Sequence, residues 1–109
     1  MKKRNIVKEK KDFDIIFKLR NQTSSKFYYI YIKDNDLNKF KFGICVSKKL
    51  GNAVTRNKLK RRVKDIIDKS KLHFGSKDYI IVLKKSAKSA KYLELKEDLI
   101  SVLKKIIDR

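Results

Sequence analysis

The fold is decided by residues 40–69, FKFGICVSKKLGNAVTRNKLKRRVKDIIDK, in which the pattern of a strand is followed by that of a helix. Over residues 40–47 apolar side chains alternate with small or polar ones, as in a strand with one buried face. Over residues 54–69 apolar side chains recur three and four positions apart, as on the buried face of a helix. These helix positions are Leu59, Val63, Ile66 and Ile67. The stretch therefore predicts a strand, a connection over residues 48–53 and an amphipathic helix that packs on the sheet.

The strand over residues 40–47 predicts a sheet with two different faces. Successive side chains of a strand point to opposite sides. One side carries the apolar residues Phe40, Phe42, Ile44 and Val46. The other side carries Lys41, Gly43, Cys45 and Ser47. The small residues of the second side are expected to leave a trough along the sheet.

The flanking sequence predicts four further elements. Residues 9–20 form a helix that presents Phe13, Ile16, Phe17 and Arg20 on one face. Residues 26–33 are rich in aromatic and β-branched types and form a strand in which Phe27, Tyr29 and Tyr31 share a face. The apolar run 79–83 is a strand covered on both faces, and an amphipathic helix runs from Tyr92 towards the C-terminus. The pattern alone gives the order α-β-β-α-β-α, with residues 84–91 as a basic loop.

Composition predicts one small cytoplasmic domain, residues 1–109, that binds a polyanion. The chain carries 31 Lys and Arg against 12 Asp and Glu, a formal net charge of +19. A small domain with so much charge of one sign is expected to have a polyanionic partner, which leaves RNA, DNA and an anionic membrane as candidates. The N-terminus is charged and lacks the apolar stretch of a signal peptide. With one cysteine and one histidine, the chain is expected to bind no metal of its own.

The positive charge is concentrated around the start of the helix over residues 54–69. Residues 48–64 hold eight cations and no acid, whereas a merely solvated face normally mixes both signs. A solvated face remains the alternative for any single lysine. On a helical wheel a second stripe lies roughly opposite the apolar one, and it consists of Asn57, Lys60, Arg61 and Lys64. The N-terminus of the helix adds an anion site beside Lys48, Lys49 and Asn52, with Arg56 at the apolar edge.

The segment SKKLGNAVTRNKLKR, residues 47–61, resembles the signature of the protein subunit of bacterial ribonuclease P, in which Arg-Asn is followed after two residues by Lys-Arg. The resemblance covers nearly the whole chain, including the Asp-Phe-x-x-x-Phe helix at residues 12–17 and Asp-Tyr-Ile-Ile at residues 78–81. One departure is Lys64, where the family often has a further arginine.

The resemblance implies an α+β fold, a two-layer αβββαβα sandwich with a left-handed β-α-β crossover. It implies a subunit of a tRNA-processing endoribonuclease whose catalytic centre and Mg²⁺ ions lie in the RNA subunit. The implied partners are this RNA and precursor tRNA, not DNA or a membrane. The signature helix is expected to bind the RNA subunit through Lys48, Lys49, Asn52, Arg56, Asn57, Lys60, Arg61 and Lys64. A cleft containing Phe13, Phe17, Tyr31 and Ser47 is expected to hold the single-stranded 5′ leader.

Two alternatives remain open from the residues alone. Phe13 and Phe17 have the spacing of ordinary core residues of a helix, which is compatible with lining a cleft wall. A non-catalytic ribosomal or RNA-chaperone protein of similar fold would show the same basic surface. A membrane-surface protein is disfavoured because the apolar helix faces are needed to cover the sheet.

Overall fold

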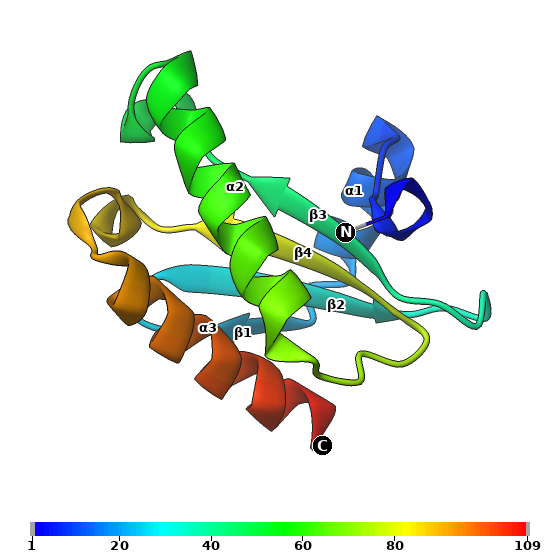
Figure 1. Ribbon diagram of the computed structural model, residues 1–109. Coiled ribbons are helices and arrows are strands. Elements are labelled where there is room, and N and C mark those ends of the chain that lie inside the picture. Colours follow the sequence, from blue (N-terminus) through cyan, green and yellow to red (C-terminus); the bar gives the residue numbers. More distant parts are fainter. Residues whose placement is uncertain (1, 109) are drawn as a thin grey trace.

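The computed structural model describes residues 2–108 and shows a mixed sheet covered mainly by two helices (Figure 1). The α-helices and strands are, in chain order, α1 (Lys10–Lys18), β1 (Gln22–Ser24), β2 (Tyr28–Asp34), β3 (Lys41–Cys45), α2 (Ala53–Ser70), β4 (Lys77–Leu83) and α3 (Tyr92–Ile107). Short 3₁₀ helices lie at η1 (Lys3–Asn5), η2 (Lys48–Leu50) and η3 (Lys85–Ser89). The α2 and α3 helices form a layer on one face of the sheet, and α1 covers part of the other face (Figure 1). The order αβββαβα is confirmed.

The strand that the pattern did not show is β1. Its three residues, Gln22, Thr23 and Ser24, carry no apolar alternation, because the strand lies at the sheet edge and only Thr23 is partly buried. Its strand geometry comes from antiparallel pairing with β2, in which Gln22 lies opposite Tyr31. Such tertiary pairing has no local sequence signal.

The connection between β3 and β4 gives the fold its handedness. The strand order is β1-β2-β4-β3, with β4 antiparallel to β2 and parallel to β3. Seen from the side of α2 with β3 pointing up, β4 lies to the left of β3 (Figure 1). The β3-α2-β4 crossover is therefore left-handed, the hand found in very few parallel crossovers.

The main core lies between the sheet and the α2–α3 layer. It contains the four apolar α2 residues expected from the helical spacing, and Tyr28 donates a hydrogen bond of 3.0 Å to the Leu95 carbonyl of α3. The central strand β4 is covered on both faces, as its continuous apolar run predicts. Ile81 belongs to the main core, whereas Ile80 packs with Val7 and Ile16 in a small second core on the α1 side.

The expectation that Phe27 shares a face with Tyr29 and Tyr31 is wrong. Phe27 is buried in the main core, on the opposite side of the sheet. Phe27 lies in a bend before β2, which begins only at Tyr28. The alternation of the strand therefore does not extend to Phe27. The Asp98 carboxylate of α3 holds this bend by accepting hydrogen bonds from the Phe27 N–H (2.9 Å) and the Ser25 hydroxyl (2.8 Å). The bend sets which β2 side chains face α1.

Replacing Asp98 by alanine is expected to lower the free energy of unfolding by about 1–3 kcal/mol, because partly buried donors lose their acceptor. Urea unfolding measures this loss. Glu97→Ala removes the same charge from an exposed neighbour on α3 and is expected to change stability by less than about 0.5 kcal/mol. Equal losses in the two variants would show that the Asp98 hydrogen bonds contribute nothing beyond charge.

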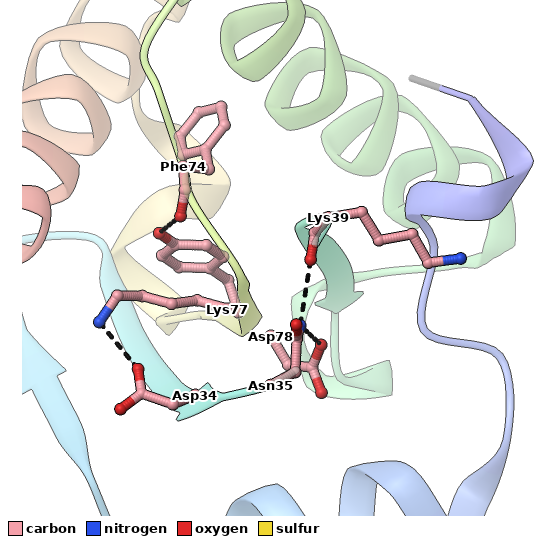
Figure 2. Close-up of polar contacts among 7 residues, drawn as sticks. Asp34, Asn35, Lys39, Phe74, Lys77 and Asp78 are labelled. Carbon is pink, nitrogen blue, oxygen red and sulfur yellow. Dashed lines mark hydrogen bonds and ion pairs between the residues drawn. The ribbon is translucent and has the colours of Figure 1, made fainter. Parts of the chain in front are cut away.

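Side chains tie the β2–β3 turn to the start of β4 (Figure 2). The Asn35 amide donates to the Lys39 carbonyl (3.1 Å) and to the Asp78 carboxylate (2.8 Å). Asp78 is 8% exposed, so this amide satisfies a buried acid. The Lys77 ammonium pairs with Asp34 at 3.0 Å beside it. The β2–β3 turn is thus fixed to the sheet.

Candidate RNA interface

The sheet face opposite α2 and α3 carries two rows of side chains, because residues paired across neighbouring strands share a face. The first row lies under α1 and consists of Gln22, Tyr31, Ile80 and Gly43. The second row lies one step closer to the start of α2 and consists of Ser24, Tyr29, Val82 and Cys45. We call this second row the open row.

Aromatic side chains of α1 cover the first row. The Phe17 and Tyr31 ring centroids are 4.7 Å apart with the rings nearly perpendicular. Phe13 follows at 6.4 Å from Phe17, and all three rings are partly buried around the small second core. The structure therefore brings together three of the four residues expected in the leader cleft. Phe13 and Phe17 are both core residues and parts of the cleft wall, since each ring packs on the core and keeps an exposed surface.

The trough expected at Gly43 is filled by Phe13. A Cβ atom added at Gly43 would lie 2.7 Å from Cε1 of Phe13 and 2.8 Å from Cδ1 of Ile80. Sequence alternation shows that the position is small but not that a ring from another element occupies the space. The absent side chain thus lets α1 approach the sheet closely, and the open part of the face lies beside α1.

We expect Gly43→Ala to lower the free energy of unfolding by about 1–3 kcal/mol, because Phe13 and Ile80 must shift to accept the methyl group. Urea unfolding measures the change. The double variant Gly43→Ala/Phe13→Leu is expected to lose less than the two single variants together, because leucine leaves room for the methyl group. Additive losses would contradict close packing of Phe13 on Gly43.

A small cavity of about 310 Å³ lies where α1 ends against β1 and β2. Phe17, Arg20, Gln22 and Tyr31 line it, and the Gln22 amide donates a hydrogen bond of 2.8 Å to the Tyr31 hydroxyl. Arg20 lies two residues beyond the end of α1 and has a φ of 53°. Sequence reasoning did not assign Arg20 or Gln22 to the site. The helical spacing placed Arg20 on the same face as Phe17, whereas Gln22 gave no signal because β1 was not visible.

The open row offers an uncovered surface beside the aromatic cluster. Tyr29 is 39% exposed, and the Lys84 ammonium lies 4.5 Å from its ring centroid. At the other end of the row, burial raises the pKa of the Cys45 thiol, and the nearby positive charge of Lys60 opposes that shift. Aromatic and cationic groups side by side suit the bases and phosphates of a single strand.

The basic stripe of α2 divides into two parts. Asn57 and Arg61 are exposed on the outer surface of the helix. Lys60 and Lys64 are partly buried and line a cavity of about 250 Å³ together with Phe13, Gly43 and other residues. A helical wheel cannot show this division, because it depends on where β3 and α1 lie relative to α2. Lys60 and Lys64 therefore connect the signature helix to the aromatic cluster.

The start of α2 is formed by side-chain caps. The Asn52 Oδ1 atom accepts a hydrogen bond of 3.0 Å from the Thr55 N–H, and Lys48 and Lys49 are exposed in η2. The Ser47 hydroxyl accepts from the Lys49 N–H at 3.1 Å. Since β3 ends at Cys45, Ser47 lies beyond the strand, and the structure does not group it with the three aromatic residues. Its role in leader binding stays a prediction.

Arg56 lies at the edge of the apolar face, as the wheel predicts, and is partly buried. Its Nε–H is shielded from solvent and has no acceptor among residues 2–108.

Within residues 2–108 the structure shows no group of three or more His, Cys, Asp and Glu side chains that would hold a metal ion. In the same part of the chain, no helix has the length and apolar character needed to span a membrane.

Comparison with known proteins gives one family. The family model described as Ribonuclease P matches residues 1–107. The ribonuclease P protein component of Streptococcus pneumoniae serotype 4 is 40% identical over 105 residues, which cover 95% of this chain and 85% of the relative. The RNase P protein of Staphylococcus aureus has a TM-score of 0.86 and 36% identity, covering 92% of this chain and 93% of that one. The RNase P protein of Thermotoga maritima has a TM-score of 0.83 and 25% identity, covering 91% of this chain and 94% of that one.

Proposed function

Because this chain belongs to the ribonuclease P protein family, we propose that it docks on the RNA subunit through α2 and holds the 5′ leader of precursor tRNA on the open row. The chain is a protein subunit of a tRNA-processing endoribonuclease, and its partner is the ribonuclease P RNA. The family match decides against the ribosomal or RNA-chaperone alternative. We also propose that the chain works in the cytoplasm and binds neither DNA nor membranes.

The observation that carries the leader assignment is the position of the open row between two kinds of side chain. On one side stand the rings of Phe17 and Tyr31, and at the Cys45 end stands Lys60. A single-stranded leader needs both, because bases stack on aromatic rings and phosphates require cations. The outer face of α2, with Arg61 exposed, is left for the structured RNA subunit.

The catalytic centre is proposed to lie in the RNA subunit, together with its Mg²⁺ ions. Mg²⁺ prefers carboxylate, phosphate and water oxygens. The surfaces described above present mainly ammonium, guanidinium and aromatic groups, so they do not fit this ion and fit phosphate instead. The chain's own contribution is then to position the substrate and to neutralise phosphate charge where two RNA molecules meet.

Cleavage of precursor tRNA by the RNA subunit from the same organism tests the proposal. The reaction is run at low Mg²⁺, with and without this chain, on substrates whose leaders differ in length. Stimulation by the chain is expected to grow as the leader lengthens and then to level off once the open row is filled. Stimulation that is independent of leader length would contradict the leader assignment, and no stimulation despite intact RNA binding would contradict the subunit role in cleavage.

A further inference from the structure

A larger cavity lies at the opposite end of β3 from the start of α2, outside the surfaces described above. Its volume is about 690 Å³, and two loops, residues 37–40 and 73–76, line it together with Arg4 and Asn5. The Asn5 side chain donates a hydrogen bond of 2.7 Å to the Phe40 carbonyl, which fixes the N-terminal wall. The volume falls within the range of small-ligand sites.

Aromatic rings form a rigid apolar surface in this cavity. The Phe40 and Phe74 ring centroids are 5.1 Å apart, and Phe74 packs on Phe42 at 4.9 Å. Phe74 is 5% exposed, and its carbonyl accepts a hydrogen bond of 2.6 Å from the Tyr79 hydroxyl (Figure 2). Phe40 is partly exposed on top of this cluster. Its ring is therefore held in place with some surface open, as stacking of a base requires.

The cavity lining carries two cations, Arg4 and Lys39, among polar residues that also include Asn5, Asn38 and Ser76. His73 lines it as well, and no Asp or Glu does. The buried acid nearby, Asp78, is bound by the Asn35 amide, and the Lys39 ammonium extends away from both residues (Figure 2). The ion pairs found within residues 2–108 include neither Arg4 nor Lys39. Cations that form no ion pair, beside an aromatic surface, favour a ligand with both an anion and a flat ring.

We propose that this cavity binds one nucleotide of an RNA strand, with its base stacked on Phe40 and its phosphate held by Arg4 and Lys39. A strand fits better than a free nucleotide because a second, smaller cavity of about 200 Å³ shares Arg4 and Lys39. That cavity adds Lys3, Lys8 and Lys41 against Glu9 and Asp12. Neighbouring phosphates of the same strand would meet these cations. The site rests on the proposed function only in that the partner is RNA.

Fluorine NMR of the full chain labelled with para-fluorophenylalanine tests this site, because each of the six phenylalanines gives its own resonance. Substitution to leucine, one position at a time, assigns the resonances. Titration with a short oligouridylate is expected to shift the Phe40 resonance in a saturable manner. The double variant Arg4→Gln/Lys39→Gln is expected to weaken this binding about tenfold or more. The matched variant Lys104→Gln/Lys105→Gln, which removes the same charge from exposed positions on α3, is expected to change it by less than about twofold.

The same spectra separate this site from the expected leader cleft, a groove whose occupancy Phe13 and Phe17 report. A shift of Phe13 and Phe17 without Phe40 would overturn the cavity site and leave the groove intact. A shift of Phe40 alone would support the cavity site and count against the groove. An equally strong response to uridine monophosphate would overturn the assignment to an RNA strand, and equal weakening by the two double variants would reduce the binding to general charge attraction.

Discussion

Replacing Arg61 by alanine is expected to weaken binding of the ribonuclease P RNA by roughly 10- to 150-fold, since a hydrogen bond to a charged group contributes about 1.5–3 kcal/mol. Arg61 is exposed on the outer face of α2, and the ion pairs found within residues 2–108 do not include it. Its guanidinium can therefore bind a phosphate through two parallel hydrogen bonds without breaking an existing pair. Titration of the RNA at several salt concentrations measures the affinity, and one lost phosphate contact lowers the salt slope by about 0.9.

Two further variants separate geometry from charge at this position. Arg61→Lys keeps the charge but loses the bidentate geometry, so its affinity is expected to lie between those of the wild type and Arg61→Ala. Lys105→Ala removes an equal charge from the far end of α3 and is expected to leave the affinity within about twofold. An equal loss in Arg61→Ala and Lys105→Ala would show that net charge, not the α2 surface, determines docking.

Arg56→Ala is also expected to weaken docking on the RNA subunit, without a matching loss of folding stability. The shielded Nε–H of Arg56 has no acceptor among residues 2–108, so this group gains no hydrogen bond in the free protein. Its removal is therefore expected to change the free energy of unfolding by less than about 1 kcal/mol, as urea unfolding will measure. A stability loss as large as the docking loss would assign Arg56 to packing of α2.

Local sequence was sufficient to predict the elements with strong periodicity. The helix over residues 54–69 repeats apolar residues at helical spacing, and residues 79–83 form a short continuous run rich in β-branched residues; both elements are confirmed. The crossover hand came only from the resemblance, because a local pattern carries no information about the order of strands in a sheet. The strand β1 has no local signal, because its three polar edge residues adopt strand geometry only through their partner β2.

The candidate site shows the same division between local and tertiary information. Side-chain alternation correctly placed Tyr29 and Tyr31 on one face, but the bend held by Asp98 moved Phe27 to the other. The N-terminal segment gave no signal either, although Ile6 pairs with Phe42 alongside β3. These features depend on contacts between residues far apart in the chain. A pattern within one element cannot contain them.

Tyr31→Ala is expected to weaken binding of precursor tRNA with a long leader by roughly 5- to 150-fold, the range for loss of one base stacked on an aromatic ring. Tyr31 is partly buried against Phe17 and receives a hydrogen bond from Gln22, so its ring has a fixed orientation at the edge of the open row. Affinity for the RNA subunit is expected to change by less than about twofold, because Tyr31 lies on the opposite face of the sheet from the α2–α3 layer. Affinities for substrates with and without a leader, measured with the assembled enzyme, check both statements.

The variant Tyr31→Phe distinguishes stacking from hydrogen bonding. It keeps the ring and the contact with Phe17 but removes the hydroxyl that the Gln22 amide reaches at 2.8 Å. If stacking dominates, Tyr31→Phe retains most of the leader-dependent affinity that Tyr31→Ala loses. If both variants lose it equally, the Gln22–Tyr31 pair recognises the leader through hydrogen bonds. Loss of docking and leader affinity together in Tyr31→Ala, to the extent seen in Arg61→Ala, would contradict two separate surfaces, because a single RNA contact region would then include both residues.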